Sequence, residues 1–159
     1  PFNPSGDGNL KDWWTEADAE LFASKTKIMV KQAKSYTYID AEDGNKEYFM
    51  NPELCMGENL ADLGGLSLSL NALKKSLVAS NASAGVTKAA VRTSFKAWAT
   101  IWKLNIKKDS RLQRLTTDPH APCDFRANLV NNMQEWYDVF DIKEGDPMYI
   151  PPADRLRMW

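Results

Sequence analysis

Apolar residues recur at helical spacing along several long stretches of the chain. In the first stretch they are Leu21, Phe22, Ile28, Met29 and Ala33, which would share one face of a helix. Thr15 ahead of this stretch is a good N-cap residue, and Asp18 lies at the third helical position, as in an approximate capping box. The pattern predicts five helices, over residues 16–35, 55–78, 87–107, 109–115 and 128–140.

Turn-forming residues separate the predicted helices. Asp43 and Gly44 indicate a turn in the polar connection after the first helix. Residues 37–39 just before it would form a short strand or an extended piece. Asn51-Pro52-Glu53 is typical of a helix start. A further loop is expected over residues 116–125, and the tail is expected to be extended around Pro151 and Pro152.

Composition and charge exclude several classes of protein. With 159 residues the chain is long enough to bury one hydrophobic core. Its 20 basic and 21 acidic residues nearly balance, and no basic patch interleaved with aromatic residues points to nucleic acid. No apolar run approaches the length of a membrane span. Cys55 and Cys123 are too few for a disulfide framework and lack metal-ligand spacing, so we expect two free or buried thiols.

The second predicted helix carries two features that are costly by themselves. Glu58 and Asp62 lie four residues apart on one face, where like charges repel by a few tenths of a kcal/mol. Gly64 and Gly65 each cost a helix about 1 kcal/mol relative to alanine. A divalent metal near Glu58 would remove the repulsion, and a closely packed backbone would explain the glycines. On these residues alone, an exposed acidic helix start with a Gly-Gly break is the simpler explanation.

Residues Gly57–Gly65 read Gly-Glu-Asn-Leu-Ala-Asp-Leu-Gly-Gly, which resembles the third-ligand motif of the neprilysin family of zinc metallopeptidases. Gly8–Thr15 is similar to the family segment that shortly follows the zinc-binding helix. Asp118–Arg126 resembles the loop with the catalytic histidine, and Met148–Trp159 is similar to the family's carboxyl terminus. These four segments follow the order of the family and extend over nearly the whole chain.

The chain departs from the family pattern in one respect, because it contains no His-Glu-x-x-His motif and His120 is its only histidine. In the family, that motif lies on an upstream helix and supplies two zinc ligands and the general-base glutamate. We therefore expect residues 1–159 to be the carboxyl-terminal portion of a single, incomplete catalytic domain, beginning shortly after the zinc helix. The resemblance implies a mainly α-helical fold, the helical carboxyl-terminal half of a thermolysin-like zinc peptidase domain.

The resemblance also implies roles for residues of the predicted second helix. Glu58 matches the carboxylate that completes the zinc site, in which bound water becomes a nucleophile near neutral pH. Asp62 would accept a hydrogen bond from one of the two zinc-binding histidines and fix the tautomer of that ring. Asn59 resembles a family residue that is linked to the substrate site.

Further roles fall on the loop after the fourth predicted helix. By resemblance, His120 would donate a hydrogen bond to the oxyanion that develops on the scissile carbonyl, with Asp118 orienting its ring. Arg126 would grip a substrate backbone carbonyl on the leaving-group side. Without the motif, a lone histidine is usually structural and Arg126 would be a surface ion pair. Arg157 is equally consistent with a place near the substrate pocket and with a salt bridge that holds the tail. Cys123 matches no fixed cysteine of the family, which bears on the local shape of this loop.

These observations predict a zinc-dependent endopeptidase that is inactive as the present chain alone. Zinc is expected in the complete enzyme and not in this chain, and the partners are peptide substrates and the amino-terminal part of the same protein. Leu156 stands where disulfide-rich animal members have a cysteine, so we expect a bacterial protein. The resemblance implies an extracytoplasmic location. The alternative is a non-catalytic helical interaction module or an excised fragment, and a His-Glu-x-x-His motif upstream would decide against it. A third possibility is that the missing half is a separate polypeptide.

Overall fold

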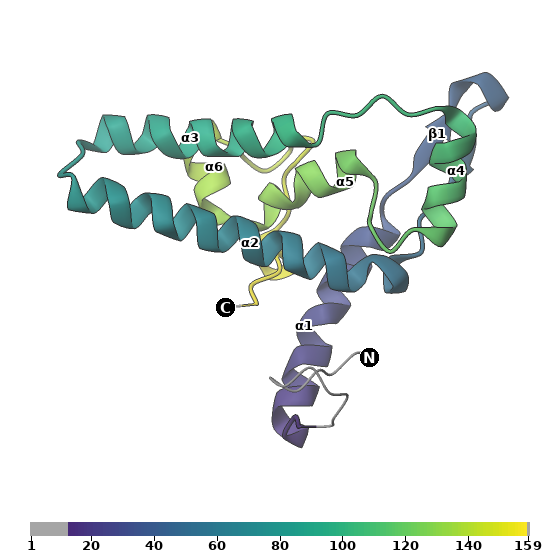
Figure 1. Cartoon of the computed structure of the whole chain (residues 1–159), viewed down its shortest axis with the longest axis horizontal. Helices are drawn as coiled ribbons and strands as arrows, with labels where there is room; N and C mark the ends of the chain where they lie inside the picture. The colour runs from purple at the N-terminus through teal and green to yellow at the C-terminus, as the bar shows by residue number, and fades with distance from the viewer. Residues whose placement is uncertain (1–12, 159) are drawn as a thin grey trace.

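Two long helices, α2 (Pro52–Ala79) and α3 (Ala84–Ile101), run side by side as an antiparallel hairpin in the computed structural model, which describes residues 13–158 (Figure 1). Asn51 begins α2, because its side chain accepts a hydrogen bond from the Leu54 N–H and Pro52 takes the first helical position. Ser83 caps α3 in the same way. The helix start predicted at Asn51 is therefore confirmed.

Helix α1 (Glu16–Lys34) crosses the first half of α2 and projects away from the hairpin (Figure 1). Its N-cap is Thr15, whose hydroxyl accepts a hydrogen bond from the Asp18 N–H as the sequence predicts. Met29 and Ala33 are buried against other elements. Of the segment predicted from Gly8–Thr15, residues up to Asp12 lie outside the described residues.

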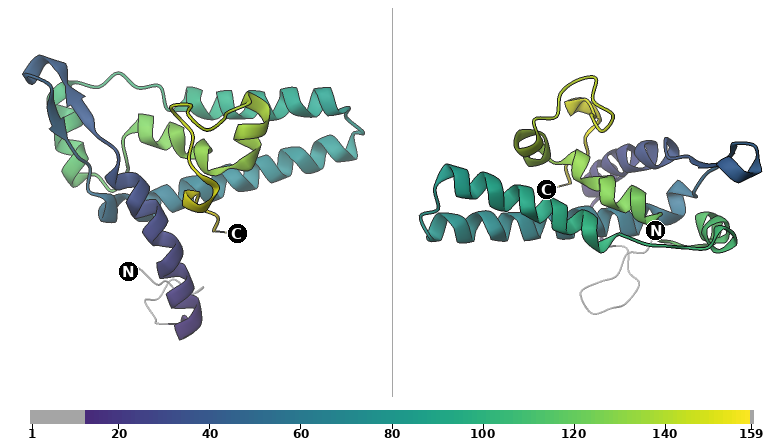
Figure 2. Two further views of the ribbon diagram at one scale, coloured as in Figure 1. Left: turned by 180° about the vertical axis from the view of Figure 1, so that it is seen from behind. Right: turned by 90° about the horizontal axis from the view of Figure 1, so that it is seen from above.

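A small β-hairpin and helix α4 (Lys108–Thr117) lie together at the end of the molecule where α2 begins (Figures 1 and 2). Strands β1 (Tyr38–Asp40) and β2 (Lys46–Tyr48) pair antiparallel, and the 3₁₀ turn η1 (Ala41–Asp43) joins them. The buried carboxylate of Asp40 forms an ion pair with Lys108, which fastens the hairpin to α4. The hydrogen bond from Lys108 lowers the pKa of Asp40 below its ordinary value, although burial opposes that shift.

Two predicted helix boundaries are wrong. The third predicted helix begins earlier than residue 87 and ends at Ile101, after which residues 102–107 lead across to α4. The predicted helix over residues 128–140 is divided among the last residue of α5 (Cys123–Asn128), η2 (Leu129–Asn132) and α6 (Gln134–Phe140). Helix α5 begins inside the loop predicted over residues 116–125. Met133 is extended between the last two, so the chain turns there instead of continuing as one helix.

The carboxyl-terminal tail also differs in part from the prediction. Residues expected to be extended form the 3₁₀ turn η3 (Pro152–Asp154). The tail is held against the body of the structure by the Asn132 carboxamide, which accepts a hydrogen bond from the Leu156 N–H at 2.7 Å. No helix within residues 13–158 is both long enough and apolar enough to cross a membrane.

The Gly-Gly break of the simpler explanation is absent, because α2 runs without interruption through Gly64 and Gly65, as the helix predicted over residues 55–78 does. Gly64 is buried, whereas Gly65 is exposed. A Cβ atom built on Gly65 would have no described neighbour within 4 Å. No residue within 13–158 therefore packs closely on Gly65. The closely packed backbone that would explain this glycine stays a prediction.

Three clusters of buried side chains hold these elements together. One fills the space between the α2–α3 hairpin and α6, a second joins α1 and α2 to the tail, and a third lies between α1, α4 and the start of α2. The first cluster is formed by Leu66, Leu70, Val91, Phe95, Val130 and Val139.

Two leucines on α2 test this arrangement with the same substitution. Leu70 is 2% exposed and Leu68 is 72% exposed. Leu70→Ala should lower the free energy of unfolding of the 159-residue chain by about 2–5 kcal/mol, because it leaves a cavity in the first cluster. Leu68→Ala should change it by less than about 0.5 kcal/mol. Urea unfolding followed by circular dichroism measures both, and equal losses would contradict the assignment of the buried face.

Candidate active site

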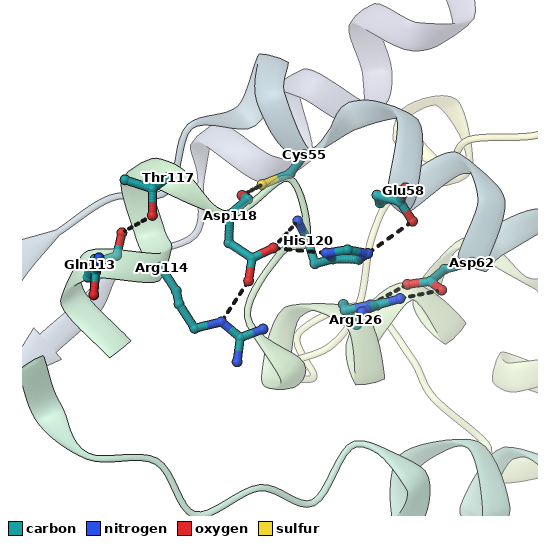
Figure 3. A network of polar contacts seen from close by, with 9 residues as sticks. All are labelled: Cys55, Glu58, Asp62, Gln113, Arg114, Thr117, Asp118, His120 and Arg126. Carbon is teal, nitrogen blue, oxygen red and sulfur yellow. Dashed lines mark hydrogen bonds and ion pairs between the residues drawn. The ribbon is translucent and has the colours of Figure 1, made fainter. Parts of the chain in front are cut away.

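Helix α2 presents two carboxylates toward the loop and helix that follow α4. Glu58 and Asp62 lie one turn apart, as their spacing predicts, and both side chains point to the same side (Figure 3). The Glu58 side chain is 45% exposed, whereas that of Asp62 is only 13% exposed. Glu58 is therefore open to a ligand, and Asp62 is committed to an internal partner.

That partner is Arg126 on α5. Its Nε donates to Asp62 Oδ2 at 2.5 Å and its Nη2 donates to Oδ1 at 2.8 Å, a bidentate pair that is largely shielded from solvent. The guanidinium also stacks on the Trp102 ring at 3.9 Å, and the Trp98 indole donates to the Arg126 carbonyl. Arg126 therefore forms an ion pair, as in the alternative explanation, but the pair lies between two helices and is mostly buried instead of exposed at the surface.

His120 lies in the loop between α4 and α5, held by Asp118 (Figure 3). Asp118 Oδ1 accepts a hydrogen bond from the His120 backbone N–H at 2.9 Å and lies 2.8 Å from ring Nδ1. The other Asp118 oxygen accepts from Arg114 Nε at 2.7 Å. Asp118 therefore orients the ring, as the sequence predicts.

The same contacts change the acidity of Asp118. Partial burial on its own raises the pKa of this carboxyl. The hydrogen bonds from His120 and Arg114 outweigh burial and lower the pKa to about 2. Asp118 is thus a fixed negative charge next to the imidazole across the neutral range.

The other ring nitrogen of His120 faces α2. Nε2 lies 3.4 Å from Glu58 Oε2, so the loop and α2 bring together two residues that are 62 positions apart in the sequence. Four residues predicted from two motifs (Glu58, Asp62, His120 and Arg126) consequently lie close together (Figure 3).

Other predicted site residues lie elsewhere. Asn59 is fully buried, and neither its amide oxygen nor its nitrogen has a partner among the described residues. This position does not support direct contact with a substrate, so the predicted role of Asn59 remains without support.

Arg157 is exposed and forms no ion pair within residues 13–158, so a salt bridge through this side chain does not hold the tail. Cys55 and Cys123 are free thiols, as expected.

Tyr36, Arg111 and Asp124 form a further polar group that supports α5 and that the sequence did not predict. The Tyr36 hydroxyl lies 3.0 Å from both Asp124 carboxylate oxygens and accepts a hydrogen bond from Arg111, which itself pairs with Asp124 at 2.9 Å. Burial is the main reason that the pKa of Tyr36 rises to about 12, with Arg111 acting in the opposite direction. These residues come from three elements and share no motif, so no sequence signal links them.

The described residues do not supply all the ligands that a metal site needs. No group of three or more His, Cys, Asp or Glu side chains within residues 13–158 is placed to hold an ion. Catalytic zinc takes three protein ligands, and the exposed Glu58 carboxylate fits one of them. The Asp62 carboxylate is held by Arg126, and Nδ1 of His120 is held by Asp118.

The acidity of Asp118 predicts a pH dependence of stability. Because the folded-state pKa is below the ordinary value of 3.8, its contribution is complete above about pH 5 and is lost as pH falls toward 2. Asp118→Asn should therefore lower the free energy of unfolding by up to about 2 kcal/mol at pH 6, and by much less at pH 2.

Urea unfolding at a series of pH values measures this difference. Asp109→Asn, at an exposed carboxylate of the same helix, controls for the loss of one charge. A difference between Asp118→Asn and the unsubstituted chain that did not shrink at low pH would contradict the proposed contacts.

Comparison with known proteins identifies the family of the chain. The family model for peptidase family M13 matches residues 2–156. A neutral endopeptidase of Lactococcus lactis subsp. cremoris is 34% identical over 154 residues, which cover 96% of this chain and 22% of that protein. Endothelin-converting enzyme 1 of Homo sapiens is 29% identical over 157 residues, 96% of this chain and 19% of that protein.

Solved structures show the same likeness. The crystal structure of the Mycobacterium tuberculosis zinc metalloprotease Zmp1 in complex with an inhibitor superposes with a TM-score of 0.85 at 38% identity, covering 97% of this chain and 24% of that one. PepO from Lactobacillus rhamnosis HN001 gives a TM-score of 0.78 at 29% identity, covering 96% and 22%. The chain thus spans about a quarter or less of these relatives, and its fold is the mainly helical fold of the matched region. The chain belongs to peptidase family M13.

Proposed function

We propose that the complete protein containing this chain is a zinc-dependent endopeptidase in which metal-activated water cleaves peptides. The observation that carries the proposal is the Glu58–His120 approach at 3.4 Å, beside the Asp62–Arg126 pair, in a member of a peptidase family. Glu58 and Asp62 come from α2, whereas His120 lies in the loop before α5 and Arg126 on α5. Glu58 and His120 are exposed beside the mostly buried Asp62–Arg126 pair. In this proposal, residues 1–159 are the carboxyl-terminal part of one catalytic domain and are inactive alone.

Glu58 would hold the zinc ion, together with two ligands from the amino-terminal part of the protein. When bound, zinc would lower the pKa of its water and polarise the scissile carbonyl. The fit rests on Glu58 itself, which is open to solvent and negatively charged, and whose one described polar partner is His120 at 3.4 Å. No second ligand is required from the described residues.

His120 would stabilise negative charge on the substrate. Its Nδ1 is occupied by Asp118, so Nε2 is the nitrogen that is free to face a peptide. Donation from Nε2 while Nδ1–H stays on Asp118 requires the imidazolium form, because only that form carries both protons. The adjacent Asp118 charge and the fixed ring orientation mean that little reorganisation is needed when the oxyanion forms.

Arg126 would bind a substrate carbonyl while it remains anchored by Asp62. Bidentate pairing with Asp62 uses Nε and Nη2 and leaves Nη1 outside that pair. Stacking on Trp102 fixes the plane of the guanidinium. Asp62 thus orients Arg126 in this structure, and its predicted hydrogen bond to a zinc-binding histidine would be an additional contact. An extracytoplasmic location of the protein is a further part of this proposal and rests on the family resemblance.

Metal content tests the proposed role of Glu58. The complete protein should bind one zinc ion, and Glu58→Gln should abolish both stoichiometric zinc and peptide hydrolysis, because one of three ligands is lost. Glu53→Gln, on the same helix at a carboxylate that is 63% exposed, should change neither. The 159-residue chain should bind no stoichiometric zinc. Metal analysis and calorimetry measure these quantities, and retention of zinc by Glu58→Gln would remove Glu58 from the metal site.

Steady-state kinetics test the proposed role of His120. In the complete protein, His120→Phe should lower kcat about a hundredfold to a thousandfold with a much smaller change in KM, as expected for the loss of one oxyanion donor. The zinc content should stay the same. An unaltered kcat would exclude His120 from the mechanism, and loss of zinc would identify it as a ligand.

A further inference from the structure

Helix α5 carries Arg126 and begins directly after the loop that holds His120. The helix has only six residues, Cys123–Asn128, so its own hydrogen bonds give it little stability and contacts with other elements determine where it lies. The Asp62–Arg126 pair ties one side of α5 to α2. The direction in which α5 presents Arg126 therefore depends on what holds the opposite side of the helix.

Asp124 lies on the side of α5 opposite to Arg126, because residues two positions apart on a helix point in nearly opposite directions. Both oxygens of its carboxylate lie 3.0 Å from the Tyr36 hydroxyl. Arg111 Nη2 donates to Asp124 at 2.9 Å and to the Tyr36 hydroxyl at 3.0 Å. Tyr36 follows α1 and Arg111 lies on α4, so these contacts tie α5 to two further elements.

Packing restricts the two side chains that hold Asp124. The Tyr36 ring meets the Phe125 ring edge-on with centroids 6.0 Å apart, and the Arg111 guanidinium stacks on the Tyr38 ring at 4.2 Å. Burial raises the pKa of Tyr36 to about 12. The hydroxyl therefore stays protonated at neutral pH, and it donates to Asp124 while it accepts from Arg111.

We propose that Tyr36 and Arg111 are positioning residues for peptide hydrolysis: through Asp124 they hold α5, and with it Arg126, in the orientation that the substrate requires. The loop that holds His120 continues directly into α5, so the same contacts restrict the imidazole from the carboxyl-terminal side of its loop. This inference rests on the proposed peptidase function. It adds two residues that act on that site through the backbone of α5.

Tyr36→Phe tests the proposal in the complete protein, because it removes one hydroxyl and keeps the ring that meets Phe125. The kcat/KM for a peptide should fall about tenfold, since a displacement of about 1 Å in a positioned group can cost roughly a hundredfold. The zinc content should stay the same. Tyr48→Phe is the matched control, because the Tyr48 hydroxyl also donates to a carboxylate, that of Asp43 in the β-hairpin, and it should leave kcat/KM unchanged.

A double-mutant cycle with Arg126→Lys separates positioning from a general loss of stability. Lysine cannot form the bidentate contact, so the orientation of α5 matters less in that background. Tyr36→Phe should then lower kcat/KM by only about twofold instead of tenfold, because the two residues act on one step. A general loss of folded protein would instead lower kcat/KM by the same factor in both backgrounds.

Substitutions at Arg111 provide a second measurement that does not depend on Arg126→Lys. Arg111→Gln should lower kcat/KM about tenfold, because the contact between α4 and Asp124 is lost. Arg111→Lys keeps a positive charge beside Asp124 and should restore part of that loss. Equal losses from the two variants would contradict a role for the Arg111–Asp124 contact.

Two further results would overturn the inference. One is an unchanged kcat/KM in Tyr36→Phe, and the other is a loss that is the same with and without Arg126→Lys. If the complete protein cleaved no peptide, the proposed function would fail instead. Crystal structures of the complete protein with and without Tyr36→Phe would still test the positioning by itself, because a displaced α5 supports it and an unmoved α5 contradicts it.

Discussion

The bidentate ion pair between Asp62 and Arg126 is the contact on which the rest of the site depends. It joins α2 to α5, and both side chains are at least 86% buried. Removing one partner of such a pair leaves an uncompensated charge and typically costs about 3–5 kcal/mol. Because Glu58 lies one turn before Asp62 and His120 lies six residues before Arg126, this pair also sets the distance between Glu58 and His120.

The surrounding contacts restrict the same two elements further. Asp118 ties the His120 ring to its loop, and Tyr36 with Arg111 holds Asp124 in the first turn of α5. The loop is therefore fixed at both ends, toward α4 and toward α1. A histidine and an arginine held in this way meet the requirement of preorganised groups for charge that develops during a reaction.

The sequence predicted which segments are helical better than where each helix ends. It identified candidate site residues but not the residues that hold them in place. Thr15 and Asn51 carry side-chain caps, so both helix starts could be predicted from local chemistry. The end of α3 at Ile101 and the turn at Met133 carry no glycine or proline, and only tertiary packing determines them. Motif resemblance brought Glu58, His120 and Arg126 into one hypothesis. The Asp62–Arg126 pair could not be predicted, because contact between residues 64 positions apart depends on the packing of α5 on α2.

The most direct test of this account is the position of zinc in a crystal structure of the complete protein. Anomalous scattering at the zinc edge, in the presence of a peptide-like inhibitor, locates the metal relative to the two elements. The account predicts a zinc ion about 2.0–2.2 Å from the Glu58 carboxylate, with the Asp62–Arg126 pair intact and His120 Nε2 directed at the inhibitor. A zinc ion bound through His120, or one remote from Glu58, would contradict it.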